Sequence, residues 1–374
     1  MSKKIPYINL IKQSKQEKKQ IFNSLNKLLK KGQFVLGEEV DRFEKKISNF
    51  LKVKECVALN SGTDALILAL SLTGVRKGDE VITPPNSFIA SSAAIAHIGA
   101  VPVFADVKDD QNINPKEIEK KITRKTRAIM PVHLSGHPCE MDQIKKISKN
   151  YNIPIVEDAA QAIGTKYKGK FVGTFGEVGC FSAHPLKNLN AIGDAGYFVT
   201  NNRKIANKAR LLRNHGIEER DKVISFGFVS RMDNLQATVL NLRFKKLKSV
   251  INKRRLNAKL YCKILKNVKN ILLPEEKKFE LNTYHTFVIK AEKRNYLKKY
   301  LEKKGISTTI HYPHLIFEQI AYKKKYKKVN PKEFPISLKL SKEILTLPIN
   351  QYMTKEEIKR TCNEIKNFYK IRAK

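Results

Sequence analysis

The sequence predicts an α/β fold, with a mainly parallel β-sheet covered by helices on both faces, followed by a smaller α+β domain. From Lys54 to about Thr200, short runs rich in Val and Ile alternate with longer helical stretches. These runs are apolar along their whole length, which is typical of parallel strands buried on both faces. Near Leu235 the pattern changes to amphipathic helices and separate strands, which indicates a second unit.

Each element of the first domain follows from its composition. Short apolar runs bounded by turn residues predict strands, and longer runs of Leu, Ala and Ile at helical spacing predict helices. The expected strands, in chain order, are "CVALN", "EVITPP", "VPVFADV", "RAIMPVHL", "IPIVEDAA", "GCFSA" and "GYFVT". The expected helices between them are "DALILALSL", "FIASSAAIAHIG", "NPKEIEKKI" and "MDQIKKISKNY".

The second unit begins with apolar residues at three- and four-residue spacing. They predict one long amphipathic helix that carries the chain out of the first domain, at Leu240, Phe244, Leu247 and Ile251. A strand at "YHTFVIKAE", a helix at "NYLKKYLEKKG" and a strand at "STTIHY" follow. The last helix is expected to open at a capping box formed by Thr354 and Glu357. We therefore expect a large domain with an N-terminal helical arm over residues 1–240 and a small domain over 241–374.

Composition restricts the class of protein. The formal net charge of +38 favours an anionic partner such as nucleic acid. The lysines crowd into polar helix faces and loops, however, and no nucleic-acid-binding motif accompanies them, so a solvated surface explains the charge better. Five scattered cysteines suit a reducing compartment. No apolar run is long enough to span a membrane, and we expect a soluble, cytoplasmic protein.

One lysine stands apart from the others. Phe171 to Asn202 holds a single basic residue, Lys187, although 73 of the 374 residues are Lys or Arg. A lysine in an uncharged, half-buried loop has its charged form disfavoured, which leaves a free amine for imine formation. The competing interpretation, a lysine that only reaches along the surface, is commoner for a lysine taken alone.

Two further features precede this lysine in the α/β domain. Asn60 to Thr63 lie between a strand and a helix, where backbone amides can bind a phosphate, although the same residues also form an ordinary N-cap. Glu157 and Asp158 end an apolar strand, where a carboxylate can pair with a cationic ring or cap the following turn. A phosphate cradle, a strand-end carboxylate and an isolated lysine together are what pyridoxal 5′-phosphate requires.

The run "FSAHPLKNLNAIGDAG" resembles the cofactor-lysine motif of the DegT/DnrJ/EryC1/StrS aminotransferases. Blocks in the family's order span nearly the whole chain, among them "SGTDALILAL", "TPPNSFIASSAAIAHIGAVPVFADV", "VEDAAQAIG", "SRMDNLQATVLNLR" and "IHYP". The resemblance implies the aspartate aminotransferase fold, fold type I, with a mainly parallel seven-stranded sheet between helices. It also implies pyridoxal 5′-phosphate as cofactor.

The resemblance further implies roles for individual residues. Lys187 would carry the cofactor as a Schiff base and then act as general acid and base, and Asp158 would pair with the pyridine nitrogen. The remaining expected contacts are Gln161 with the ring hydroxyl, Phe88 stacked on the ring, and Gly62, Thr63 and Ser182 at the phosphate. From the residues alone, core packing for Phe88 and a surface amide for Gln161 would be preferred.

The resemblance implies a homodimer whose active sites are completed by the neighbouring subunit. Many members carry an asparagine that reaches the partner's cofactor phosphate, where this chain has Val229. Valine cannot make that contact, so the phosphate is expected to be held differently here. Arg231, in the same segment, is expected to contact the substrate. His311 and Tyr312 resemble residues that line the sugar site. His133, His137 and Cys139 are close enough in sequence to suggest a metal site, but the resemblance assigns them no such role, and we expect none.

The expected activity is transfer of an amino group from L-glutamate to a keto group of a nucleotide-linked sugar. The form "KNLNAIGDAG" is more similar to members that act at C-3 than to those that act at C-4. Alternatives are a 4-keto sugar aminotransferase, a dehydratase that uses pyridoxamine phosphate, and a nucleic-acid-binding regulatory protein. The dehydratases replace the cofactor lysine by histidine, so Lys187 argues against that alternative.

Overall fold

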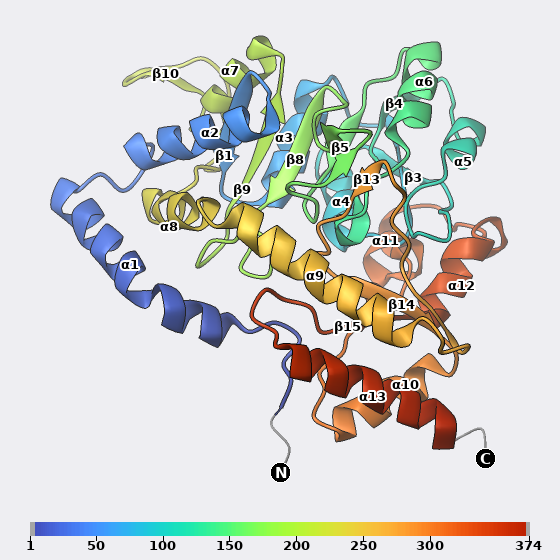
Figure 1. The fold of residues 1–374 in the computed structure, drawn as a ribbon. Coiled ribbons are helices and arrows are strands. Elements are labelled where there is room, and N and C mark those ends of the chain that lie inside the picture. Colours follow the sequence, from blue (N-terminus) through green and yellow to red (C-terminus); the bar gives the residue numbers. More distant parts are fainter. Residues whose placement is uncertain (1–3, 372–374) are drawn as a thin grey trace.

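The computed structural model describes residues 4–371 (Figure 1). Its centre is a sheet whose seven strands run in the order β1-β9-β8-β5-β4-β2-β3, the β5 and β4 halves being joined by parallel bridges. β9 is antiparallel to its neighbours, and the pairs β5–β8, β2–β3 and β2–β4 are parallel. The mainly parallel sheet is confirmed. Its strands are β1 (Glu55–Leu59), β2 (Glu80–Thr83), β3 (Val101–Phe104), β4 (Thr126–Ile129), β5 (Val156–Asp158), β8 (Val178–Ser182) and β9 (Gly196–Thr200).

The strands bury both faces because alternate side chains enter different cores. In β1, Cys56 and Ala58 join one cluster, and Val57 and Leu59 join the other. The first cluster is covered by α2 (Glu38–Leu51), α6 (Met141–Tyr151) and α8 (Asn234–Phe244). The second is covered by α3 (Gly62–Leu72), α4 (Ile89–His97) and α7 (Arg203–Leu212).

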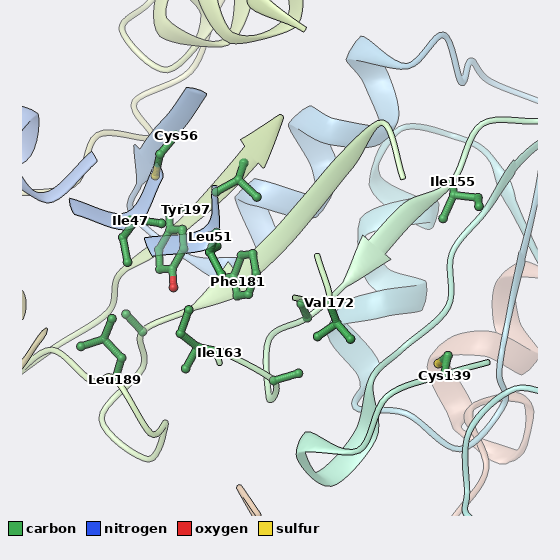
Figure 2. Packing of buried hydrophobic residues seen from close by; sticks show 14 of the residues in the cluster. Ile47, Leu51, Cys56, Cys139, Ile155, Ile163, Val172, Phe181, Leu189 and Tyr197 are labelled. Atoms are coloured by element: carbon green, nitrogen blue, oxygen red, sulfur yellow. The ribbon is translucent and has the colours of Figure 1, made fainter. Parts of the chain in front are cut away.

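Aromatic side chains fill the first core beneath the sheet (Figure 2). Phe181 and Tyr197 stack with ring centroids 5.0 Å apart. Leu189, two residues after Lys187, is buried in the same core. The segment that carries Lys187 is therefore anchored to the sheet's hydrophobic side.

The C-terminal part of the chain forms a third core. It lies between α9 (Leu247–Leu265), α10 (Arg294–Lys303), α13 (Lys355–Ile371) and a sheet in the order β12-β14-β15. The strands of that sheet are β12 (Ile271–Leu272), β14 (Phe287–Ala291) and β15 (Ile344–Leu347). Between β12 and β14, β13 (Glu280–Leu281) returns to pair with β6 (Lys166–Tyr167). The exact division at residue 240 stays a prediction.

The remaining described elements connect these cores. Helix α1 lies along the left edge of the molecule and crosses the end of α8 (Figure 1). These elements are α1 (Leu10–Lys31), α5 (Pro115–Lys120), α11 (Ile320–Lys325), α12 (Pro335–Glu343), β7 (Lys170–Phe171), β10 (Ile217–Glu219) and β11 (Lys222–Val223), with 3-10 turns at Leu134–Gly136, Ile316–Glu318 and Pro331–Glu333. None of the helices in residues 4–371 is long and apolar enough to cross a membrane.

Two expected elements differ from the structure. The single helix through Leu240 and Ile251 is two helices, because α8 packs against α1 and α2 whereas α9 continues to α13. The expected strand "STTIHY" is irregular and keeps only an isolated bridge, Thr309 to Thr346. Its residue His311 lies near enough to Lys187 for the lysine charge to lower the pKa of the imidazole. The capping box is confirmed, since Thr354 and Glu357 exchange backbone-to-side-chain hydrogen bonds of 2.9 and 3.2 Å.

Candidate active site

Lys187 lies in the loop between β8 and β9, beside the carboxyl end of β5. Lys187 is half-buried, and loss of hydration around its amine lowers the pKa to about 8, against the opposing influence of the Asp158 carboxylate. Asp158 itself is buried at the end of β5. Loss of hydration raises its pKa, although hydrogen bonds and the Lys187 charge act the other way. The fold therefore brings together two residues that are 29 positions apart in the sequence.

The Asp158 carboxylate is held by two donors. The Ser91 hydroxyl donates to Oδ2 at 2.7 Å, and the Ala160 amide donates to Oδ1 at 3.1 Å. Ser91 lies in the first turn of α4, three residues after Phe88, which caps that helix. The sequence reasoning missed Ser91, because a serine in a run of Ala and Ser carries no signal of its own.

Glu157 has a different environment from Asp158, since neighbouring residues of a strand point to opposite faces. Its carboxylate accepts hydrogen bonds from the amides of Gly173, Phe175 and Gly176 at 2.6–2.7 Å. His133 Nε2 lies 3.0 Å from Glu157 Oε2. Glu157 thus fixes the loop after β7, and its oxygens are occupied.

The residues proposed from sequence as a phosphate cradle meet at the start of α3. The Ser61 hydroxyl caps the helix by accepting from the Asp64 amide at 3.1 Å, whereas the first two amides of a helix have no intrahelical partner. A Cβ atom at Gly62 would lie 2.8 Å from Ser182 Cβ, and one at Gly196 would lie 2.2 Å from the Ser61 carbonyl carbon. The backbone segments are thus packed so closely that no side chain fits between them. An anion can therefore come close to the free amides.

Aromatic and imidazole side chains form the opposite wall. The rings of Phe88 and Tyr312 are 5.9 Å apart, and the Gln161 side-chain amide donates to the Tyr312 hydroxyl at 3.3 Å. Gln161 Oε1 accepts from the Ser135 amide at 2.7 Å. His311 Nδ1 lies 3.0 Å from the Thr346 hydroxyl. Burial, followed by the Lys187 charge, lowers the pKa of His311 to about 4, so this imidazole is neutral at pH 7.

His285 is a second buried histidine near Lys187 that the sequence reasoning missed. It lies just before β14, burial and the Lys187 charge keep its pKa well below the usual value, and its Nδ1 has no hydrogen-bond partner among the described residues. The only available signal was a single histidine near the start of the run "YHTFVIKAE". A lone histidine in such a run is usually a core residue.

Arg231 is not joined to this cluster by any contact among the described residues. Its guanidinium donates to Asn214 Oδ1 at 3.0 Å, and Val229 pairs with Asn214 through a backbone bridge. The Val229 side chain is exposed. Arg231 and Val229 thus lie together in the segment that follows β11.

The three residues considered for a metal site make other contacts. His133 accepts from the Cys139 amide at 3.1 Å, and His137 Nε2 lies 3.0 Å from Glu280. The Cys139 thiol donates to the Val132 carbonyl at 3.3 Å. Over residues 4–371, no group of three or more His, Cys, Asp or Glu side chains is placed to hold a metal ion.

Comparison with known proteins identifies the family. The sequence profile of the DegT/DnrJ/EryC1/StrS aminotransferase family matches residues 15–366. The chain belongs to this family. Its members are pyridoxal phosphate-dependent, so the chain is a pyridoxal phosphate-dependent aminotransferase.

Relatives and solved structures agree in length with this aminotransferase. It is 37% identical to dTDP-3-amino-3,6-dideoxy-alpha-D-galactopyranose transaminase of Aneurinibacillus thermoaerophilus, with 97% of this chain and 99% of the relative covered. It is 35% identical to a pleiotropic regulatory protein of Geobacillus stearothermophilus, over 98% and 99%. DesV of S. venezuelae superposes with a TM-score of 0.95 at 33% identity, over 98% and 99% of the two chains. NtdA of Bacillus subtilis, solved with bound pyridoxamine phosphate, gives 0.91 at 32%, over 98% and 85%.

Proposed function

We propose that this aminotransferase moves an amino group from L-glutamate to the C-3 keto carbon of a nucleotide-linked sugar. The observation that carries the chemistry is the Lys187 amine, whose pKa is lowered to about 8, beside the buried Asp158 carboxylate. The proposed substrate is supported by the Aneurinibacillus relative, which is named as a 3-amino sugar transaminase. The form "KNLNAIGDAG" also favours C-3, because it is similar to the motif of family members that act at that carbon.

The residues present fit the cofactor by their chemistry. Free amides at the start of α3, with Gly62, Thr63 and Ser182, suit a phosphate dianion. Asp158, costly to bury as an anion, suits a cationic ring nitrogen. When bound, pyridoxal phosphate supplies an aldehyde for the amine and an electron-poor ring that stabilises charge on the adjacent carbon.

Lys187 would hold the cofactor and move the proton between the substrate carbon and the cofactor carbon. With a pKa of about 8, its amine takes up and releases a proton at neutral pH more evenly than an ordinary lysine does. Asp158 would keep its negative charge by pairing with the ring, and Ser91 would orient it. Phe88 would cover one ring face, and the second Gln161 amide hydrogen would reach the ring hydroxyl.

The lowered pKa of the Lys187 amine should be measurable from the pH dependence of its reaction with pyridoxal phosphate. We expect the rate at which apoprotein captures pyridoxal phosphate to rise about tenfold per pH unit up to pH 7 and to level off above about pH 8, because only the neutral amine attacks. Stopped-flow absorbance measures this rate, and N-acetyl-lysine provides the unburied reference. A rate that still rises tenfold between pH 8.5 and 9.5 would contradict the lowered pKa. The neighbouring titratable groups are Asp158, His184, His285 and His311.

His311 and Tyr312 would contact the sugar. Tyr312 lies beside Phe88 and Gln161, and the His311 ring centroid is 5.2 Å from that of Tyr312. Neutral His311 can donate or accept a hydrogen bond without adding charge. Arg231 is proposed to contact the substrate only through a second subunit, because no described contact joins it to the Lys187 cluster within one chain.

We also propose a homodimer as the working form. Leu186 and Ile192, on either side of Lys187 in its loop, are exposed apolar side chains, and others are exposed in the segment that ends at Val229. Exposed apolar side chains grouped in this way favour an interface. The exposed members of that segment are Val223, Ile224, Phe226, Phe228 and Val229.

The proposed dimer can be tested at the most exposed apolar residue of this segment. We expect Phe226→Glu to raise the dimer dissociation constant by at least about 100-fold. Phe226 is fully exposed in one protomer, and the substitution would place a charged carboxylate in the proposed interface. Sedimentation velocity measures the dissociation constant. Leu272→Glu, an exposed apolar residue on the separate β12 strand, is the control. Equal constants for the two variants would refute this interface.

The substrate class is tested by product formation. The purified holoenzyme is incubated with glutamate and matched 3-keto and 4-keto nucleotide sugars, and 2-oxoglutarate release is followed. Turnover with 3-keto sugars supports the proposal, and turnover with 4-keto sugars alone moves the reaction to C-4. Loss of the keto sugar's hydroxyl without 2-oxoglutarate release would indicate a dehydratase. No turnover with any sugar removes the substrate class.

A further inference from the structure

Helix α1 buries two polar side chains in its first half. Gln13 and Glu17 are 5% and 6% exposed and lie on the same stripe as buried Leu28, whereas Ile11, Phe22 and Leu29 are 73%, 57% and 63% exposed. A surface helix normally buries its apolar stripe. Buried polar side chains persist where they are hydrogen-bonded, so the partners of Gln13 and Glu17 show what this face binds.

Gln13 pairs with Asn190, 177 positions away. The two side-chain amides exchange hydrogen bonds: Gln13 Nε2 donates to Asn190 Oδ1 at 3.0 Å, and Asn190 Nδ2 donates to Gln13 Oε1 at 3.2 Å. Asn190 Nδ2 also donates to the Pro185 carbonyl at 2.5 Å. Asn190 is therefore tied both to α1 and to the opposite side of its own loop.

Glu17 reaches the same loop through an arginine. Arg243, near the end of α8, is 8% exposed, and its Nε donates to Glu17 Oε2 at 2.8 Å. Its Nη1 donates to the carbonyls of Asn190 and Ala191 at 2.8 and 2.9 Å. The guanidinium thus joins a carboxylate of α1 to two consecutive carbonyls of the loop.

These contacts converge on the segment that carries Lys187. The Ala191 amide donates to the Ala183 carbonyl at 2.7 Å and closes the loop at its base. Leu189 fixes the inner side in the hydrophobic core (Figure 2). Lys187 lies three residues before Asn190, so a shift at Asn190 displaces the amine.

We propose that Gln13, Glu17 and Arg243 form a polar clamp through which helix α1 positions the Lys187 loop for catalysis. They are positioning residues, since none of their described contacts is with Lys187 itself. The inference rests on the role proposed above for Lys187. Directional hydrogen bonds to two carbonyls and one amide fix the loop's place and orientation, which an apolar contact does not do.

The test compares holoenzymes with altered clamps. Glu17→Gln removes the counter-charge of Arg243 without changing size, and Gln13→Leu leaves the Asn190 amide without its partner. We expect kcat to fall about 10- to 100-fold with little change in KM for the sugar, because the amine is misplaced while the substrate contacts remain. Arg243→Lys, which keeps the charge but loses the fork, should lie between these variants and the parent.

Three measurements separate positioning from general loss of structure. Hydrogen exchange of the Lys187 and Ala191 amides should accelerate, since both are hydrogen-bonded within the loop. The pH midpoint of the bound cofactor's absorbance band should shift, because the amine's hydration and its distances to Asp158, His184, His285 and His311 change. Circular dichroism should be unchanged. The control is Gln20→Ala on the same helix, whose side chain makes only a 3.4 Å contact with Lys246 among its described hydrogen bonds.

The outcomes distinguish the inference from the function on which it rests. If borohydride reduction of the parent holoenzyme leaves Lys187 without added cofactor mass, the proposed role of Lys187 fails and the clamp fails with it. If Lys187 is labelled but Glu17→Gln and Gln13→Leu match Gln20→Ala in kcat, exchange and absorbance midpoint, the clamp alone is refuted. A fall in kcat with unchanged exchange and midpoint also refutes it.

Discussion

Replacing Lys187 by alanine is expected to lower kcat by at least about 10⁴-fold. The substitution removes both the amine proposed to hold the cofactor and the group proposed to move the proton, and no second lysine occurs between Phe171 and Asn202 to take over. The measurement is 2-oxoglutarate release under saturating glutamate and keto sugar. Absorbance of the purified protein provides a second readout, since pyridoxal phosphate should no longer remain attached after gel filtration.

The matched control is Lys204→Ala, an exposed lysine on α7 outside the site. It should retain the parent kcat and cofactor content. Added methylamine should restore part of the activity of Lys187→Ala if the missing function is proton transfer by an amine. Activity within tenfold of the parent would show that Lys187 is not the proposed catalytic residue.

Replacing Asp158 by asparagine is expected to reduce kcat about 10²- to 10³-fold, because a neutral amide cannot hold a proton on the cofactor's ring nitrogen. The side chain keeps its size, and its Oδ1 can still accept from the Ala160 amide. The control is Asp142→Asn, since that carboxylate is largely exposed and pairs with Lys168. Steady-state kinetics with saturating cofactor separates the lost chemistry from weaker cofactor binding.

The same substitution should stabilise the protein without cofactor. Burial raises the pKa of Asp158, so the folded chain binds its proton more tightly than the unfolded chain does. Stability therefore falls as pH rises through the unfolded pKa toward the folded one, and at pH 7 the charged carboxylate remains a cost. Asp158→Asn removes that cost, and we expect the melting temperature of the apoprotein at pH 7 to rise by about 2 °C. A lower melting temperature at pH 7 would contradict this account.

The sheet and its helices could be predicted because each strand carries its own signal. Runs such as "CVALN" and "GYFVT" are apolar on both faces, and the structure buries both faces in separate cores. The break after Phe244 could not be predicted, because the helical period continues through it and only the change of packing partner ends α8. The residues of "STTIHY" favour a strand locally, yet in the structure they keep only one isolated bridge to β15.

The site also contains residues that could be predicted from the sequence and residues that could not. Lys187 and Asp158 could be found because each contrasts with its surroundings, a charge in an uncharged loop and a carboxylate after an apolar strand. Ser91, His285 and the pairing of Gln13 with Asn190 could not, because their roles depend on contacts between distant positions. The cofactor roles of all the site residues stay predictions: Lys187, Asp158, Gly62, Thr63, Phe88, Gln161 and Ser182.

The buried polar side chains of α1 depend on partners that are synthesised much later. Asn190 and Arg243 are 177 and 226 residues downstream of Gln13 and Glu17, to which they are hydrogen-bonded. At the pace of translation, that interval lasts on the order of ten seconds or more. During this time Gln13 and Glu17 lack the hydrogen-bond partners with which they are buried, so the native packing of the first half of α1 forms late in synthesis.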